Sequence, residues 1–350
     1  MTADAVGGST LVHDAIIPDI ALRATRSRTE HNDARPEPPD IQSCRRSSVE
    51  RIPALVEPPS CLILGGRLIG QNFCVADDVV WWPRVPGASR ERVAVVSVSY
   101  NTRELTGLLL WSLRRIVNWP GLEIVIVDNG SRDGSAELLA EAGQAGVCVL
   151  VGNDVNRQHG PGLNQGISWL ASRPGPLPAW IWILDSDVAA ARPDVLSAAL
   201  SVAESESAAL IGEPQWDQWH QAERLGLYTL LLDPAQVWRQ GIGPFTDGGD
   251  PSFDLLTSAA RSGVRLAAFP FTAGGHMIHR GRGSLAAVFA AADRSHPLYD
   301  WATGHHDPHF GEVPGAGQRY KALLRAFREE TGPLTGTSLA AACGYPPRHP

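Results

Sequence analysis

Short apolar segments alternate with amphipathic segments between residues 93 and 190. Four of them are too short for helices and apolar on both faces, as buried parallel strands are. They are Val93–Val98, Glu123–Val127, Val147–Val151 and Trp180–Leu184. Helical spacing of apolar residues follows each of the first three strands. The resulting β-α-β-α-β-α-β order predicts an α/β fold with an open, mostly parallel sheet and helices on both faces.

The ends of the predicted helices carry recognisable signals. Asn101 and Glu104 have the spacing of a capping box and predict that Asn101 caps the first helix. Asp133 or Ser135 is expected to cap the second, which should end near Gly143. The third helix is expected over Leu163–Leu170.

The pattern is looser after residue 190. It predicts helices over Pro193–Ser205, Phe253–Ser262 and Tyr320–Glu330, and strands over Ala208–Ile211, Leu227–Leu232 and Val264–Phe269. We therefore expect residues 93–190 and 191–295 to be two halves of one domain. Residues 296–350 should form a C-terminal loop and helix.

The N-terminal part of the chain differs in composition from the rest. Residues 1–60 are rich in Arg, Asp, Glu, Pro and Ser and have no periodicity. Such a segment buries too little apolar surface to fold, so we expect a poorly ordered arm. Residues 61–92 contain short apolar stretches and are expected to be a small N-terminal extension.

Composition and charge argue against some classes of partner and indicate a cellular compartment. The chain has 350 residues and a net charge of −7, without the basic stripe that a nucleic-acid binder usually shows. It has 5 cysteines and no CxxC pair, which favours a reducing compartment. We see neither a signal peptide nor an apolar run of roughly 20 residues, so no transmembrane segment is predicted. Together these features predict a cytoplasmic protein.

Polar residues follow three of the predicted strands. Ser99 and Asn101 follow the first, Asp128 follows the second, and Asp185 and Asp187 follow the fourth. Open α/β sheets bind ligands beyond the carboxyl ends of their strands. Carboxylate oxygens suit Mg²⁺ or Mn²⁺, so the Asp185-Ser186-Asp187 sequence is a candidate metal site. The alternative is that both aspartates only cap the following segment.

Four segments together resemble family 2 glycosyltransferases, which have the GT-A fold. They are Val96–Asn101, Val125–Ser135, Asn153–Gly166 and Leu184–Val188. The shared features are a first strand running into Ser-Tyr-Asn, a second ending in Val-Asp-Asn-Gly-Ser-x-Asp-Gly, a Gly-rich segment, and the DxD after the fourth strand. The resemblance covers roughly residues 93–283 and is weak after residue 190.

The resemblance implies a nucleotide-sugar donor, a hydroxyl-bearing acceptor and dependence on a divalent cation, Mn²⁺ or Mg²⁺. Residues 93–190 would bind the donor and residues 191–295 the acceptor, with transfer of a hexose-type sugar by inversion. Site residues follow by matching position. Asp128 would bind the base or ribose, Ser99 and Asn101 would line the nucleotide pocket, Asp185 would contact the ribose or sugar and the metal, and Asp187 would bind the metal. Asn164 is a further candidate for the donor site, with a helix cap as the alternative.

The second half should provide the catalytic base and further phosphate contacts. Family members usually carry an acidic pair there, and Pro251-Ser252 stands near its place. Asp250 is our first candidate for the base, followed by Asp254 and Asp247, although Asp250 could instead cap the helix that follows. By resemblance, His279 would face the metal or diphosphate. Arg282 could pair with phosphate oxygens, or belong to a solvated basic turn.

Two other functions use the same sheet. A sugar-phosphate nucleotidyltransferase would usually have a Gly-rich, basic loop directly after the first strand, which Ser99–Glu104 lacks. A non-catalytic relative would bind a nucleotide-sugar without turning it over, and the missing acidic pair favours that alternative.

Overall fold

The computed structural model describes residues 92–217, 222–238, 242–246, 251–281, 283, 310–311 and 313–345. The chain divides into two units, Met1–Cys61 and Leu62–Pro350, and every described residue belongs to the second. The predictions for residues 1–60, and for residues 61–92 apart from Arg92, therefore fall outside the described residues.

A seven-stranded sheet forms the centre of the second unit. Its order is β3-β2-β1-β4-β7-β6-β8. The strands are β1 Val93–Ser99, β2 Glu123–Asp128, β3 Val149–Gly152, β4 Trp180–Leu184, β6 Leu210–Asp217, β7 Ala222–Leu232 and β8 Leu266–Ala268. Only β7 in this sheet runs against the others. The prediction of a mostly parallel open sheet is confirmed, and the sheet continues from the first half of the domain into the second.

A second sheet of two short strands was not predicted. It pairs β5, Val188–Ala190, with β9, Met277–His279, in antiparallel register. Three residues are too few to show a period-2 pattern, which is why the sequence did not indicate either strand. Because Val188 pairs with His279, this sheet brings the late histidine next to the segment that follows β4.

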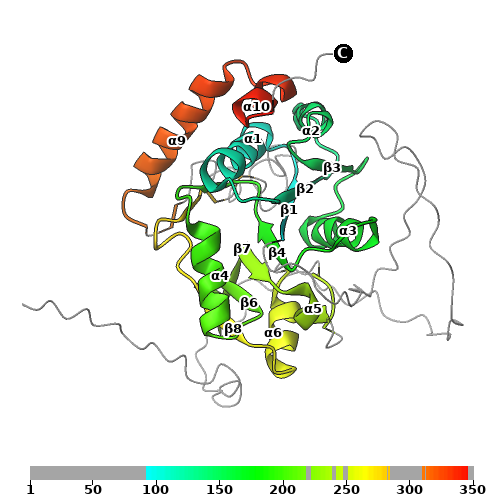
Figure 1. The fold of residues 1–350 in the computed structure, drawn as a ribbon, viewed down its shortest axis with the longest axis vertical. Coiled ribbons are helices and arrows are strands. Elements are labelled where there is room, and N and C mark those ends of the chain that lie inside the picture. Colours follow the sequence, from blue (N-terminus) through cyan, green and yellow to red (C-terminus); the bar gives the residue numbers. More distant parts are fainter. Residues whose placement is uncertain are drawn as a thin grey trace, which may run out of the picture. The chain divides into compact units, whose positions relative to one another are not determined.

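Helices cover both faces of the large sheet (Figure 1). They are α1 Arg103–Ser112, α2 Ser135–Gln144, α3 His159–Ser172, α4 Val195–Ser205, α5 Pro234–Val237, α6 Phe253–Arg261, α9 Ala316–Thr331 and α10 Gly336–Ala342, and a π-helical turn, η1 Leu113–Val117, continues α1. All the predicted helices are present, but α3 begins four residues before Leu163, and α5 and α10 were not predicted.

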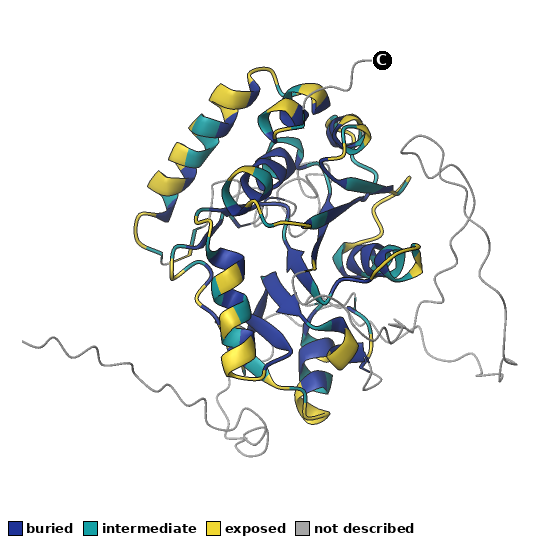
Figure 2. Cartoon of the chain, viewed as in Figure 1, coloured by how far each residue is buried: buried dark blue, intermediate teal, exposed yellow. Residues whose placement is uncertain are grey.

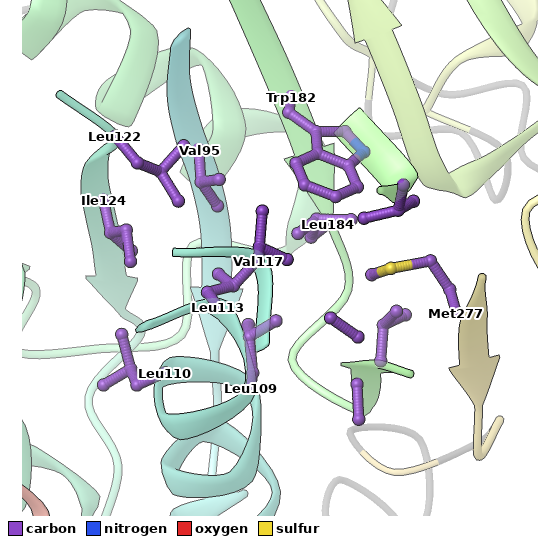
Figure 3. Close-up of a cluster of buried hydrophobic side chains, with 14 of the residues drawn as sticks. Val95, Leu109, Leu110, Leu113, Val117, Leu122, Ile124, Trp182, Leu184 and Met277 are labelled. Carbon is purple, nitrogen blue, oxygen red and sulfur yellow. The ribbon is translucent and has the colours of Figure 1, made fainter. Parts of the chain in front are cut away.

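Alternate side chains of the strands pack on opposite faces, as the period of two requires. Val95 belongs to a cluster with α1, α2, α4, α9 and α10, whereas its neighbour Val96 belongs to a cluster with α3, α5 and α6. Figure 2 shows the strands buried and the exposed residues along the outer sides of α4 and α9. Figure 3 shows part of the first cluster, where leucines of α1 and η1 meet Val95 and Ile124, with Trp182 and Met277 nearby.

The C-terminal helices are part of the first cluster. Phe327 of α9 and Leu339 of α10 are almost fully buried in it. Arg328 donates two hydrogen bonds to the carboxylate of Glu104 on α1, at 2.6 and 2.9 Å. The backbone N–H of Gly336, the first residue of α10, donates to Oε2 of Glu141 on α2 at 2.9 Å. Residues at the end of the sequence thus complete the core beside the first strands.

The first helix is not capped as predicted. Asn101 has a φ of +51°, and the helix begins at Arg103 with Thr102 as its N-cap. The N–H of Arg103 donates to Oδ2 of Asp133 at 2.9 Å. An acceptor from the loop after β2 therefore replaces the predicted capping box.

Candidate active site

The carboxyl ends of three adjacent strands meet at one edge of the sheet. Ser99 and Asp128 are register partners at the ends of β1 and β2, and β4 lies on the other side of β1. The N–H of Asn129 donates to the carbonyl of Ser99 at 2.9 Å. The structure therefore brings Ser99, Asp128 and the segment beginning at Asp185 to the same edge.

Asn101 connects the loops after β1 and β2. Its N–H donates to Oγ of Ser131 at 2.9 Å, and its Oδ1 accepts from the N–H of Arg132 at 2.7 Å. Asn101 has the left-handed backbone that asparagine tolerates better than most residues. Its amide side chain holds the two loops together beside the nucleotide pocket that the resemblance predicts.

Asp128 is buried, and its carboxylate is held within its own turn. Oδ1 accepts from Oγ of Ser131 at 2.6 Å, and Oδ2 accepts from the Ser131 N–H at 3.0 Å. Burial raises the pKa of the Asp128 carboxyl, while the hydrogen bonds from Ser131 act in the opposite direction. Each carboxylate oxygen can accept a further hydrogen bond, so this arrangement leaves capacity for a ligand.

Ser99 belongs to a buried cluster of hydroxyl groups. Its Oγ lies 3.3 Å from Oγ1 of Thr102 and 3.1 Å from Oγ1 of Thr106. Thr102 also donates to Oγ of Ser186, between the two aspartates, at 3.2 Å. The Ser99 side chain is buried, so we expect it to support the turn that carries Asp185 and Asp187 through its contact with Thr102.

Asp185, Asp187 and His279 form a cluster whose ligand atoms all lie within 4.8 Å of one another. Nε2 of His279 is 3.3 Å from Oδ1 of Asp187 and 3.8 Å from Oδ2 of Asp185. The other oxygen of Asp187 accepts from the N–H of Gly283 at 2.8 Å. A Cβ at position 283 would lie 2.9 Å from Cβ of Asp187, so only glycine fits this close approach.

The pKa values of the three side chains in the cluster are shifted in different ways. Burial raises the pKa of the Asp185 carboxyl, and the Asp187 charge adds to that effect. Burial also opposes ionisation of Asp187, but His279 outweighs it and lowers the pKa of that carboxyl. Burial alone would lower the pKa of His279, yet the carboxylate of Asp187 raises it. In the structure as it stands, His279 therefore balances part of the acidic charge.

The residues of this cluster fit a divalent cation. Oδ1 of Asp185 is a buried atom without a hydrogen-bond partner among the described residues. Two carboxylates and an imidazole are a donor set that Mn²⁺ accepts. A cation would coordinate this oxygen and offset the mutual repulsion of the two carboxylates.

His159, which was not predicted, borders the same cluster. It is the first residue of α3, and its Nε2 lies 3.5 Å from Oδ1 of Asp185. Asp185 thus lies between two imidazoles, one on each of its oxygens. The sequence indicated this role only through the position of His159 after β3, at the edge of the sheet where ligands are expected.

The Gly-rich segment serves close packing. An added Cβ at Gly160 would lie 2.0 Å from the carbonyl oxygen of Thr246, and one at Gly166 would lie 2.7 Å from Cγ1 of Val96. These glycines let α3 approach both the sheet and the segment 242–246.

Asn164 lies inside α3, so the helix-cap alternative is wrong. Its Nδ2 donates to the carbonyl of Phe245 at 2.8 Å, and its Oδ1 accepts from the N–H of Phe245 at 3.0 Å. Both polar atoms of the amide are therefore engaged with the backbone of the second half, although a direct contact of Asn164 with the donor stays a prediction.

The candidate base residues are only partly described. Asp254 is exposed in the first turn of α6. Asp247, Asp250 and Arg282 lie outside the described residues. The alternative that Asp250 caps the following helix is wrong, because Ser252 is the N-cap of α6 and the helix begins at Phe253.

Residues 94–240 match the family model described as glycosyl transferase family 2. No protein of curated function matches the chain. Solved structures to which the chain is similar include S. aureus TarS 1–349 in complex with UDP-GlcNAc, at 15% identity and a TM-score of 0.40, covering 51% of this chain and 56% of that one. Another is the mannosyltransferase PcManGT from Pyrobaculum calidifontis in complex with GDP-Man and Mn²⁺, at 19% identity and a TM-score of 0.41, covering 75% of this chain and 77% of that one.

The chain thus spans little more than half of the TarS fragment. None of the described helices has the length and apolar character needed to cross a bilayer. The family match covers the strand tips, the Gly-rich segment and the DxD, within an α/β fold of the predicted kind. The chain therefore contains a region, residues 94–240, that is similar to glycosyl transferase family 2.

Proposed function

We propose that the cluster of Asp185, Asp187 and His279 holds a divalent cation, Mn²⁺ or Mg²⁺, which binds the diphosphate of a nucleotide-sugar donor. The protein would transfer the sugar to a hydroxyl group of its acceptor, with inversion at the anomeric carbon. The observation that carries this proposal is the convergence of three ligand side chains from β9 and the end of β4, one of which, Asp185, has a buried oxygen without a hydrogen-bond partner among the described residues.

The cation would supply charge stabilisation for the leaving diphosphate. The protein's own part is to fix the ligand atoms. Asp185 and Asp187 follow a buried strand, and Gly283 holds the second oxygen of Asp187. His279 is placed by the pairing of β9 with β5. The ligands are thus held by backbone structure, which keeps them preorganised before the donor binds.

The nucleotide portion of the donor would lie over the ends of β1 and β2. Asp128 has accepting capacity for a base N–H or a ribose hydroxyl, and Asn101 holds the loop beside it. Ser99 would support this pocket through its hydroxyl cluster. For Asn164 we propose an indirect role, in which its clamp on Phe245 places the acceptor side against α3.

Inversion requires a single displacement. The acceptor oxygen attacks the anomeric carbon as the bond from that carbon to the diphosphate oxygen breaks, and a carboxylate takes the hydroxyl proton. We propose Asp250 as this base, with Asp254 and Asp247 as the other candidates. Arg282, three residues after His279, would add a positive charge for the phosphate oxygens.

The test is Asp187→Asn, which keeps the size of the side chain but removes its charge. We expect Mn²⁺ binding and metal-dependent turnover of UDP- and GDP-sugars to be lost in the folded variant. Asp233→Asn is the matched control, because Asp233 caps α5 and asparagine caps as well. Normal Mn²⁺-dependent turnover by Asp187→Asn would refute the metal assignment. Donor binding without turnover by the wild-type protein would instead favour the non-catalytic alternative.

A further inference from the structure

Half-buried Tyr228 contacts His279, and buried Glu213 contacts Tyr228 in turn. Tyr228 of β7 stacks on the imidazole of His279, with the ring centres 4.4 Å apart and the planes 10° from parallel. The rings come from strands in different sheets, β7 and β9. The Tyr228 ring therefore covers one face of the imidazole, while the edge of the imidazole that carries Nε2 faces Asp187.

The far end of the Tyr228 side chain is anchored by a carboxylate. Its hydroxyl donates to Oε2 of Glu213 on β6 at 2.7 Å. The same oxygen accepts from the N–H and the hydroxyl of Thr272, both at 2.7 Å, and Oε1 accepts from the N–H of Ala273 at 2.8 Å. Glu213 is 7% exposed, so this carboxylate is buried and held by four donors.

Glu213 is connected to His279 by two routes. One runs through the Tyr228 ring that stacks on the imidazole. The other runs through the backbone of Thr272 and Ala273, in the turn that leads into β9, where the N–H of Met277 also donates to the carbonyl of Phe271 at 2.8 Å. The carboxylate thus fixes both the strand that carries the histidine and the ring against which it packs.

We propose that Glu213 and Tyr228 are positioning residues, which hold the imidazole plane of His279 toward Asp187 and thereby set the affinity of the metal site. This inference rests on the metal site of the proposed function. Partners that orient a ligating histidine usually affect metal affinity strongly, because a free imidazole must be ordered each time the metal binds.

The chemistry at Glu213 explains why a carboxylate is needed there. Every group that faces it is a donor, and a glutamine would direct its own N–H₂ at some of them. A buried donor left without an acceptor is costly, so Glu213→Gln should disturb the turn before β9 as well as the tyrosine. Tyr228→Phe is the milder change, since it keeps the ring and the stacking and removes only the anchor on Glu213.

The experiment measures Mn²⁺ affinity of the donor-free protein for the wild type, Tyr228→Phe, His279→Ala and the double variant, with thermal unfolding beside each. We expect Tyr228→Phe to bind Mn²⁺ about 10-fold more weakly, at the lower end of the range for such partners. The change should have no effect in the His279→Ala background, because the ring that Tyr228 positions is then absent. Tyr345→Phe, on a residue that packs near Arg114, is the control for the loss of a tyrosine hydroxyl.

The outcomes separate this inference from the proposed function. A wild-type protein that binds no Mn²⁺ would overturn the metal site and the positioning role with it. Wild-type binding with an unchanged affinity in Tyr228→Phe would overturn the positioning role alone. An equal loss of affinity in both backgrounds would also overturn it, because the effect would then not pass through His279. A second readout is the ¹⁴N modulation that a coordinated imidazole gives in the spin echo of bound Mn²⁺, which should weaken in Tyr228→Phe.

Discussion

Replacing Asn164 by alanine tests whether this residue holds the second half of the domain in place or contacts the donor. The substitution removes the two hydrogen bonds between the amide and the backbone of Phe245, a residue that is only 2% exposed. Asn164 lies inside α3, so alanine should not disturb the helix itself.

The magnitude follows from the groups left behind. A buried backbone N–H or carbonyl without a partner costs about 1–3 kcal/mol, and Asn164→Ala leaves one of each on Phe245. Alanine is the better helix former by up to about 0.7 kcal/mol, which offsets part of the loss. Asn164 is half-buried, so water reaches the vacated space in part. We expect a net loss near the lower end, about 2 kcal/mol.

Urea unfolding measures that loss, and the melting temperature should fall by about 4–8 °C for a domain of this size. Ser168→Ala, also within α3, controls for helix propensity. Donor affinity is measured on the folded variant at low temperature and should equal that of the wild type. A weakened donor affinity with unchanged unfolding would refute the clamp and favour a direct contact with the nucleotide.

Three further predictions concern other parts of the structure. His159→Gln should weaken Mn²⁺ binding less than Asp185→Asn does, because His159 borders only one oxygen of that aspartate; equal losses in a Mn²⁺ titration would contradict this order. Burial raises the pKa of the Cys148 and Cys343 thiols to about 12, so maleimide labelling at pH 8, followed by peptide mass spectrometry, should be slow until the protein unfolds. Rapid labelling of both in the native protein would show that this side of the core opens easily. Leu339→Ala should cost about 2–5 kcal/mol in urea unfolding, since Leu339 is fully buried; a loss below about 1 kcal/mol would mean that α10 is not part of the core.

The sequence by itself determined the elements whose signals are local. Each buried strand of the first half shows a run of apolar residues, and the connecting helices show a period near 3.6, so the mostly parallel sheet was predictable. The position of Asp185 and Asp187 at a strand end was predictable as well, because it depends only on where the apolar run Trp180–Leu184 stops.

Contacts between distant residues were decided only by the tertiary structure. Nothing near Asn164 in the sequence indicates that its amide bonds to Phe245, 81 residues later. The loop acceptor Asp133, which takes the place of the predicted cap at Asn101, depends on how β1 and β2 sit side by side. Side-chain hydrogen bonds of this kind have no periodicity, so no pattern along the chain reports them.

In the metal cluster, too, local sequence determined some features and tertiary contacts determined others. The resemblance placed His279 near the metal, but its approach to Asp187 depends on the pairing of β5 with β9, two strands too short to leave a pattern. Tyr228 lies in a predicted strand, whereas Glu213 lies beyond Ile211, the predicted end of its strand. The role of both depends on the contact of the Tyr228 ring with His279. Local sequence determines which residues form a strand, whereas side-chain partners are set by the packing of strands against each other, because that packing brings together residues far apart in the chain.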